Sequence, residues 1–255
     1  MEQKPKIAFR RRGIYLLPNI FTTAAMFAGF YAVVASMNGQ FEKAAIAIFI
    51  AMILDGVDGR VARMTNTQSE FGAEYDSLAD MVSFGVAPAL VIYQWSLSSM
   101  ADMGWQWGKL GWLAAFIYTA CAAMRLARFN TQVGIADKRY FQGLPSPAAA
   151  AVVAGLVWVG VDNSVIGADV AKFAVIMMIS LGLLMMSNIL FYSFKEVHFK
   201  GKVSFISLLA IVLILALATI DTPKALFLVF ALYGLSGPVL SILRKARKMG
   251  RKKTV

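Results

Sequence analysis

A series of long apolar runs, separated by short polar breaks, constrains this chain more than any other feature. Of its 255 residues, 59% are hydrophobic and only 15% are charged, which is too apolar for an ordinary soluble domain. The runs are roughly 18 to 25 residues long, the length that a helix needs to cross a bilayer. Eight of them occur, at residues 16–36, 44–63, 72–98, 109–130, 145–162, 172–194, 203–220 and 225–243. The sequence therefore predicts an all-α fold, a polytopic helical membrane protein with about eight transmembrane helices.

The positive charges predict which helix ends face the cytoplasm, because loops rich in Lys and Arg are retained on that side. If the N-terminus lies inside, all but four of the 25 Lys and Arg residues fall on the cytoplasmic side, the exceptions being Lys43, Lys109, Lys172 and Lys224. This asymmetry predicts an N-in, C-in topology. The net charge of +11 sits at the ends of the runs, so we expect a bilayer with anionic headgroups as the partner and no nucleic acid.

Four carboxylates stand within or beside two of the runs. Asp55 and Asp58 are spaced i, i+3, and Asp76 and Asp80 are spaced i, i+4, so each pair shares one face of a helix. Each charge within a span costs about 2.5 to 3.5 kcal/mol. Divalent cations would offset this cost, because Mg²⁺ and Mn²⁺ prefer hard carboxylate oxygens and two such ions can share one set of acidic ligands.

Other interpretations of the carboxylates explain less of the pattern. A structural ion-pair network would use Arg60 and Arg63 as local counter-charges. An EF-hand loop is excluded, because the acidic residue required at its twelfth position is absent. A cation-coupled or proton-coupled transporter would also keep carboxylates in its spans, but the sequence shows no paired repeats or helices broken at midplane.

The complete motif from Asp55 to Asp80 reads D-x2-D-G-x2-A-R-x8-G-x3-D-x3-D. It resembles the signature of the CDP-alcohol phosphotransferase family at every fixed position. The resemblance implies six core helices around a polar cavity open to the cytoplasm, usually in a homodimer, and hence two additional helices here. It also implies that Asp55, Asp58 and Asp76 hold two divalent cations, Mg²⁺ or Mn²⁺, while Asp80 completes the metal site and acts as the general base.

Binding of the CDP-diacylglycerol substrate is implied by the same resemblance. Gly59, Ala62 and Arg63 would line the site of the CDP moiety, with Arg63 near the phosphates, and Gly72 opens the second acidic helix. The stretch "PNIFT" places Asn19 and Thr22 at the start of the first span. It resembles the family's opening P-N-x-x-T, which lies near the nucleotide pocket; without the family, Asn and Thr at a span edge would only satisfy backbone groups.

The acceptor alcohol must be judged from the later segments. "MRLARFNTQ" carries Arg125, Arg128 and Asn130, and "YFQGLPSPAAAA" carries Gly143, Pro145 and Ser146. Both stretches are similar to the bacterial and archaeal members of the family that use L-serine, and an Arg pair suits a carboxylate. The alternatives are structural. The arginines would be cytoplasmic anchors, Pro145 a helix-start residue, Ser146 a helix cap and Gly143 a turn residue.

The resemblance thus implies transfer of the phosphatidyl group from CDP-diacylglycerol to the hydroxyl of L-serine, and we expect the protein in the cytoplasmic membrane of a prokaryote, with the active site facing the cytoplasm. The alternative within the family is glycerol 3-phosphate or an inositol phosphate as acceptor. We expect a basic cytoplasmic segment at 1–15, the family's membrane core at 16–200, two additional helices at 201–243 and a basic cytoplasmic tail at 244–255.

Overall fold

The computed structural model of the protein describes residues 7–65, 69–131, 140–192 and 221–252. Within these ranges, five helical stretches are long and apolar enough to cross a membrane, at 19–37, 70–95, 105–131, 167–186 and 222–243. A shorter apolar helix spans Ser146–Asp162. The protein is therefore a multi-pass helical membrane protein, as predicted. The predicted span at 203–220 lies outside the described residues.

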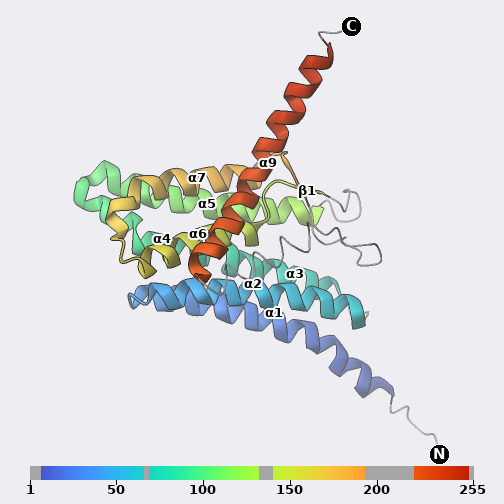
Figure 1. The fold of residues 1–255 in the computed structure, drawn as a ribbon. Coiled ribbons are helices and arrows are strands. Elements are labelled where there is room, and N and C mark those ends of the chain that lie inside the picture. The colour runs from blue at the N-terminus through green and yellow to red at the C-terminus, as the bar shows by residue number, and fades with distance from the viewer. Residues whose placement is uncertain (1–6, 66–68, 132–139, 193–220, 253–255) are drawn as a thin grey trace, which may run out of the picture.

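Three helices near the N-terminus form one side of the bundle (Figure 1). Helices α1 (Ile7–Met37) and α2 (Phe41–Thr65) lie side by side. Helix α3 (Glu70–Asp80) lies against α1 more than against α2. The α3 N-cap is Ser69, whose Oγ accepts a hydrogen bond of 3.0 Å from the Gly72 amide, which satisfies one of the free amides of the first turn.

The helical stretch that begins with α3 changes its winding directly after Asp80. A π-helix, η1 (Met81–Val86), is followed by α4 (Ala87–Trp95) and a 3₁₀ segment, η2 (Leu97–Met103). Together with α3, these elements account for the predicted run at 72–98.

On the opposite side of the bundle, α5 (Trp105–Thr131) and α7 (Ala171–Met186) lie side by side, and α7 follows the short 3₁₀ segment η3 (Gly167–Val170). Between the two sides runs α6 (Ser146–Asp162), whose residues 148–155 are all buried. Small side chains allow this central helix to approach its neighbours closely.

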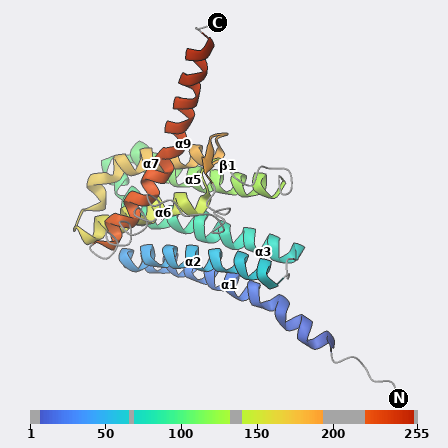
Figure 2. The same ribbon diagram turned by 45° about the vertical axis from the view of Figure 1, so that its right-hand side comes forward.

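Helix α9 (Thr222–Lys252) crosses the bundle obliquely, and its C-terminal end projects beyond the other helices (Figure 2). It packs on α6, where a Cβ added to Gly155 would lie 3.0 Å from the Cα of Phe227.

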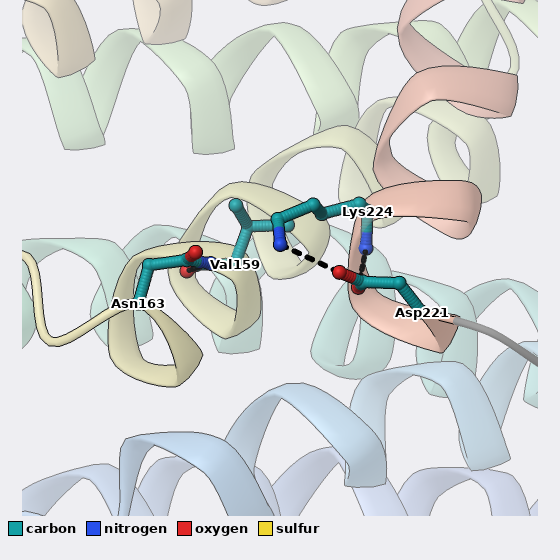
Figure 3. Close-up of polar contacts among 4 residues, drawn as sticks. All are labelled: Val159, Asn163, Asp221 and Lys224. Carbon is teal, nitrogen blue, oxygen red and sulfur yellow. Dashed lines mark hydrogen bonds and ion pairs between the residues drawn. The ribbon is translucent and has the colours of Figure 1, made fainter.

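The start of α9 is fixed by its own first turn (Figure 3). The Lys224 amide donates a 3.1 Å hydrogen bond to Asp221, and the Lys224 ammonium lies 2.6 Å from the same carboxylate. The hydrogen bond from the Lys224 side chain lowers the pKa of the Asp221 carboxyl. Close by, at the end of α6, the Asn163 side-chain amide donates to the Val159 carbonyl.

A small antiparallel sheet was not predicted. Strand β1 (Tyr140–Gln142) pairs with β2 (Leu190–Tyr192), with Phe141 opposite Phe191. The apolar run at 172–194 therefore does not remain helical to its end, because α7 stops at Met186 and Ser187 takes an extended conformation. Hydropathy locates the apolar run, but it does not predict where the helix within that run ends. That end depends on the side chains that bind the last carbonyls of α7.

Candidate active site

Three of the four acidic residues of the motif meet at one point. Asp55 projects from α2, and Asp76 and Asp80 project from α3. One carboxylate oxygen from each lies within 4.8 Å of the other two, and all three residues are partly buried. The i, i+4 spacing on α3 places its two carboxylates one helical turn apart on the same face. Such a set of hard oxygen donors matches the ligands that divalent cations prefer.

Asp58 lies outside this group of three. It is only 4% exposed, and its Oδ2 accepts a 2.8 Å hydrogen bond from the Thr22 hydroxyl of α1. Thr22 was predicted to lie at the CDP-diacylglycerol site, and the structure shows that it contacts an acidic residue of the motif directly. Thr22 stands 36 positions before Asp58, so spacing alone gave no signal for this contact.

Arg125 and Ser146 form a polar pair next to the carboxylates. Arg125, on α5, is only 8% exposed, and its Nη1 donates a 2.6 Å hydrogen bond to the Ser146 hydroxyl. Its guanidinium also interacts electrostatically with Asp80. Its Nε is buried and has no hydrogen-bond partner among the described residues. A buried guanidinium with an unused donor is suited to binding an anionic group.

Ser146 does not serve as the α6 cap. The N-cap position belongs to Pro145, which makes no side-chain cap bond, and Ser146 is the first helical residue. The alternative that treated Pro145 as a helix-start residue agrees with the structure, whereas the one that treated Ser146 as a cap does not.

Arg128 is bound in a different way from Arg125. Its guanidinium donates to the carbonyl oxygens of Gln142, Met185 and Met186, at 2.9, 3.1 and 3.0 Å. Two of these carbonyls belong to the last turn of α7, where helices have no internal donors to offer. Arg128 thus caps α7 and ties it to β1, which leaves less of its guanidinium for a substrate.

Gly143 makes the turn between β1 and α6 with a φ of +80°, and a Cβ there would lie 2.2 Å from the Met185 carbonyl oxygen. We expect Gly143→Ala to lower the free energy of unfolding by about 1–3 kcal/mol. Gly39→Ala is the matched control, because Gly39 has a φ of +71° but no atom within 4 Å of an added Cβ. Thermal unfolding in detergent should show a larger loss of stability for Gly143→Ala than for Gly39→Ala. Equal losses would show that the clash with the Met185 carbonyl oxygen contributes nothing.

The end of α5 is joined to α3 through Asn130, whose side-chain amide donates a 2.9 Å hydrogen bond to the Ser77 hydroxyl. Ser77 directly follows Asp76 on α3, so this contact holds the end of α5 next to the part of α3 that carries Asp76. A nearby contact that the sequence did not signal links Thr23 to Tyr75, whose oxygens lie 2.8 Å apart.

Among the residues predicted to bind CDP-diacylglycerol, Asn19 and Gly72 are brought together. A Cβ on Gly72 would lie 3.1 Å from the Ser69 Oγ and 3.6 Å from the Asn19 Oδ1, so the three residues are close neighbours. Gly59 is partly buried on α2, near Asp58 in sequence. The side chains of Ala62 and Arg63 lie outside the described part of the structure.

Comparison with known proteins identifies the family of the chain. The model of the CDP-alcohol phosphatidyltransferase family matches residues 15–185. The chain belongs to this family and is a transferase. It is also similar to individual members of known name.

Three such relatives carry the name CDP-diacylglycerol–serine O-phosphatidyltransferase. The Helicobacter pylori protein is 35% identical over 221 residues, 86% of this chain and 90% of the relative. The Methanocaldococcus jannaschii protein is 38% identical over 189 residues, 74% of this chain and 80% of the relative. The Mycobacterium tuberculosis protein is 43% identical over 154 residues, 57% of this chain and 51% of the relative.

Proposed function

We propose that this protein transfers the phosphatidyl group of CDP-diacylglycerol to the hydroxyl of L-serine, giving phosphatidylserine and CMP. The observation that carries the proposal is the juxtaposition of a three-carboxylate cluster with a buried Arg125–Ser146 pair that retains an unused donor. The cluster suits phosphoryl chemistry and the pair suits a carboxylate-bearing acceptor. The names of the relatives point to the same acceptor.

In the proposed reaction, Asp80 accepts the proton of the serine hydroxyl as the oxygen attacks the phosphorus that bears diacylglycerol. A new P–O bond forms, the P–O bond to the second phosphate breaks, and CMP leaves with the electron pair. Arg125 would hold the serine carboxylate, so that the hydroxyl is directed at Asp80.

The donor set of the cluster suits a divalent cation, and we propose that the site holds two, Mg²⁺ or Mn²⁺. We propose Asp55, Asp76 and Asp80 as their principal ligands, with Asp58 completing the set from its position on the Thr22 hydroxyl. Bound ions would neutralise charge on the phosphate oxygens as CMP departs. Thr22 would act by orienting Asp58.

The remaining residues of the motif would bind the CDP moiety. Asn19 lies close to Gly72, and we propose that its side-chain amide contacts the nucleotide. Gly59 and Ala62 would allow close approach to α2, and Arg63 would contact the phosphates. Gly143, Pro145, Arg128 and Asn130 would shape the acceptor site through the turn and the contacts described above.

We further propose the arrangement of the protein in its membrane. The site would face the cytoplasm in an N-in, C-in topology with eight spans, in the cytoplasmic membrane of a prokaryote and as a homodimer. Asp55 stands on the C-terminal half of α2, and Asp76 and Asp80 stand in the first half of the helical stretch 70–95, so each carboxylate lies in the half of its helical stretch that is nearer in sequence to residues 66–68. The acyl chains could then remain in the bilayer during the reaction.

The test is CMP release by purified protein in detergent with CDP-diacylglycerol and Mn²⁺ or Mg²⁺, offering L-serine, glycerol 3-phosphate and myo-inositol 1-phosphate separately. We expect CMP release when L-serine is the acceptor, and no release with either of the other two acceptors. In Arg125→Lys, which keeps the charge but loses the planar fork, the KM for serine should rise about tenfold or more. The KM for CDP-diacylglycerol should stay within about twofold, which serves as the internal control.

Each other outcome has a defined meaning. Release with glycerol 3-phosphate or the inositol phosphate would overturn serine as the acceptor while keeping the family chemistry. Cation flux in proteoliposomes without release of CMP from any acceptor would favour a transporter.

A further inference from the structure

The π-helix η1 begins directly after the proposed general base. Asp80 is its N-cap residue, and the Ala87 amide bonds to the Val82 carbonyl, five positions back. π-turns inside α-helices frequently occur at functional sites, because they change the register of the residues on either side. The direction in which Asp80 projects therefore depends on whether η1 stays in the π-helical conformation.

The sequence contains a physical cause for the change of winding. In an α-helix the Phe84 carbonyl would accept a bond from the amide of residue 88, which is Pro88 and has no N–H. The proline ring also crowds the carbonyl four positions before it. Regular α-helical bonding is therefore unavailable at this step.

Helix α5 supplies the missing donor. The Tyr118 hydroxyl donates a 3.0 Å hydrogen bond to the Phe84 carbonyl, and Tyr118 is fully buried. The neighbouring Thr119 hydroxyl lies 3.4 Å from the Gly85 carbonyl, as a weaker second contact.

The opposite face of η1 is held by α1. The Ser83 hydroxyl donates a 3.1 Å hydrogen bond to the Ala25 carbonyl. A Cβ added to Gly29 would lie 2.7 Å from the Ser83 Cα, so the two helices are in close contact there. Hydrogen bonds therefore join η1 both to α1 and to α5.

We propose that Tyr118 is a positioning residue for the reaction: by supplying the donor that Pro88 lacks, its hydroxyl holds the π-helix and so keeps Asp80 in line with Asp55 and Asp76. This inference rests on the proposed function of Asp80. Tyr118 itself touches neither substrate nor metal in this scheme. Its effect should appear in the chemical step rather than in substrate binding.

The test compares Tyr118→Phe with the full-length wild-type protein in serine-dependent CMP release. We expect kcat to fall about tenfold or more, because small misplacements of a reacting group cost rate steeply, while the KM for serine stays within about twofold. Tyr93→Phe is the matched control, since it removes the same atom from a half-buried tyrosine on α4. Its kcat should equal that of the wild type.

A double variant separates positioning from stability. Adding Pro88→Ala to Tyr118→Phe restores an amide that can bond to the Phe84 carbonyl in α-helical register. The thermal unfolding midpoint of the double variant should return towards the wild-type value. Its kcat should stay as low as that of Tyr118→Phe, because the winding next to Asp80 has changed. Recovery of kcat together with the midpoint, or a Tyr118→Phe kcat equal to that of Tyr93→Phe, would overturn the inference. An inactive wild type would instead refute the proposed function.

Discussion

Asp80→Asn will lower the rate of serine-dependent CMP release by about 10²–10⁴-fold, the range typical of a lost general base. The amide has nearly the shape of the carboxylate but cannot accept the proton of the serine hydroxyl at neutral pH. The change also removes one of three carboxylates whose oxygens lie within 4.8 Å of one another. Repulsion between like charges then falls, so the thermal unfolding midpoint should be unchanged or higher.

Lost activity together with retained stability in Asp80→Asn would identify a chemical role for Asp80. Asp102→Asn is a suitable control, because Asp102 is exposed on η2 and has no assigned role. It should keep wild-type rates. An Asp80→Asn variant that retains more than about a tenth of the wild-type rate would exclude Asp80 as the base.

Removal of divalent cations should have an effect of comparable size. Treatment with EDTA should abolish CMP release, and added Mn²⁺ or Mg²⁺ should restore it, since the transferred phosphates need positive charge on their oxygens. Asp55→Asn and Asp76→Asn should each raise the metal concentration for half-maximal activity by about tenfold or more, in line with the loss of a charged ligand. Titration of CMP release with Mn²⁺ measures both effects.

A binding measurement without substrate completes this experiment. Mn²⁺ should raise the thermal unfolding midpoint of the wild type, because a ligand that binds only the folded state stabilises it. The rise should be smaller for Asp55→Asn than for Asp102→Asn. Activity that persists in EDTA at the wild-type level would contradict the metal site, whatever the acceptor.

The parts of the structure that the sequence predicted correctly are those set by local periodicity. Runs of apolar residues marked the helices, and the i, i+4 spacing of Asp76 and Asp80 placed both on one face of α3. These relations depend only on the geometry of a single helix. The family signature added the expectation that a second helix, carrying Asp55, would meet them.

Contacts between distant segments could not be predicted in this way. The Thr22 hydroxyl reaches Asp58 across 36 positions, and Arg128 reaches the last carbonyls of α7 across 57 or more. A spacing within one helix does not say which neighbouring helix supplies a donor. The two arginines of "MRLARFN" were therefore predicted as an equivalent pair, whereas the structure gives only Arg125 a contact with Ser146.

The position of α9 has a consequence for the order in which the protein is completed during synthesis. This helix lies farthest along the described chain, yet it covers α6 at Gly155, where the backbones come close. Helix α6 begins at Ser146, the residue that holds Arg125. A nascent chain that has emerged only as far as α7 would contain every carboxylate of the motif but would lack the helix that packs on α6. The packing around α6 would therefore be completed only after the ribosome has synthesised α9.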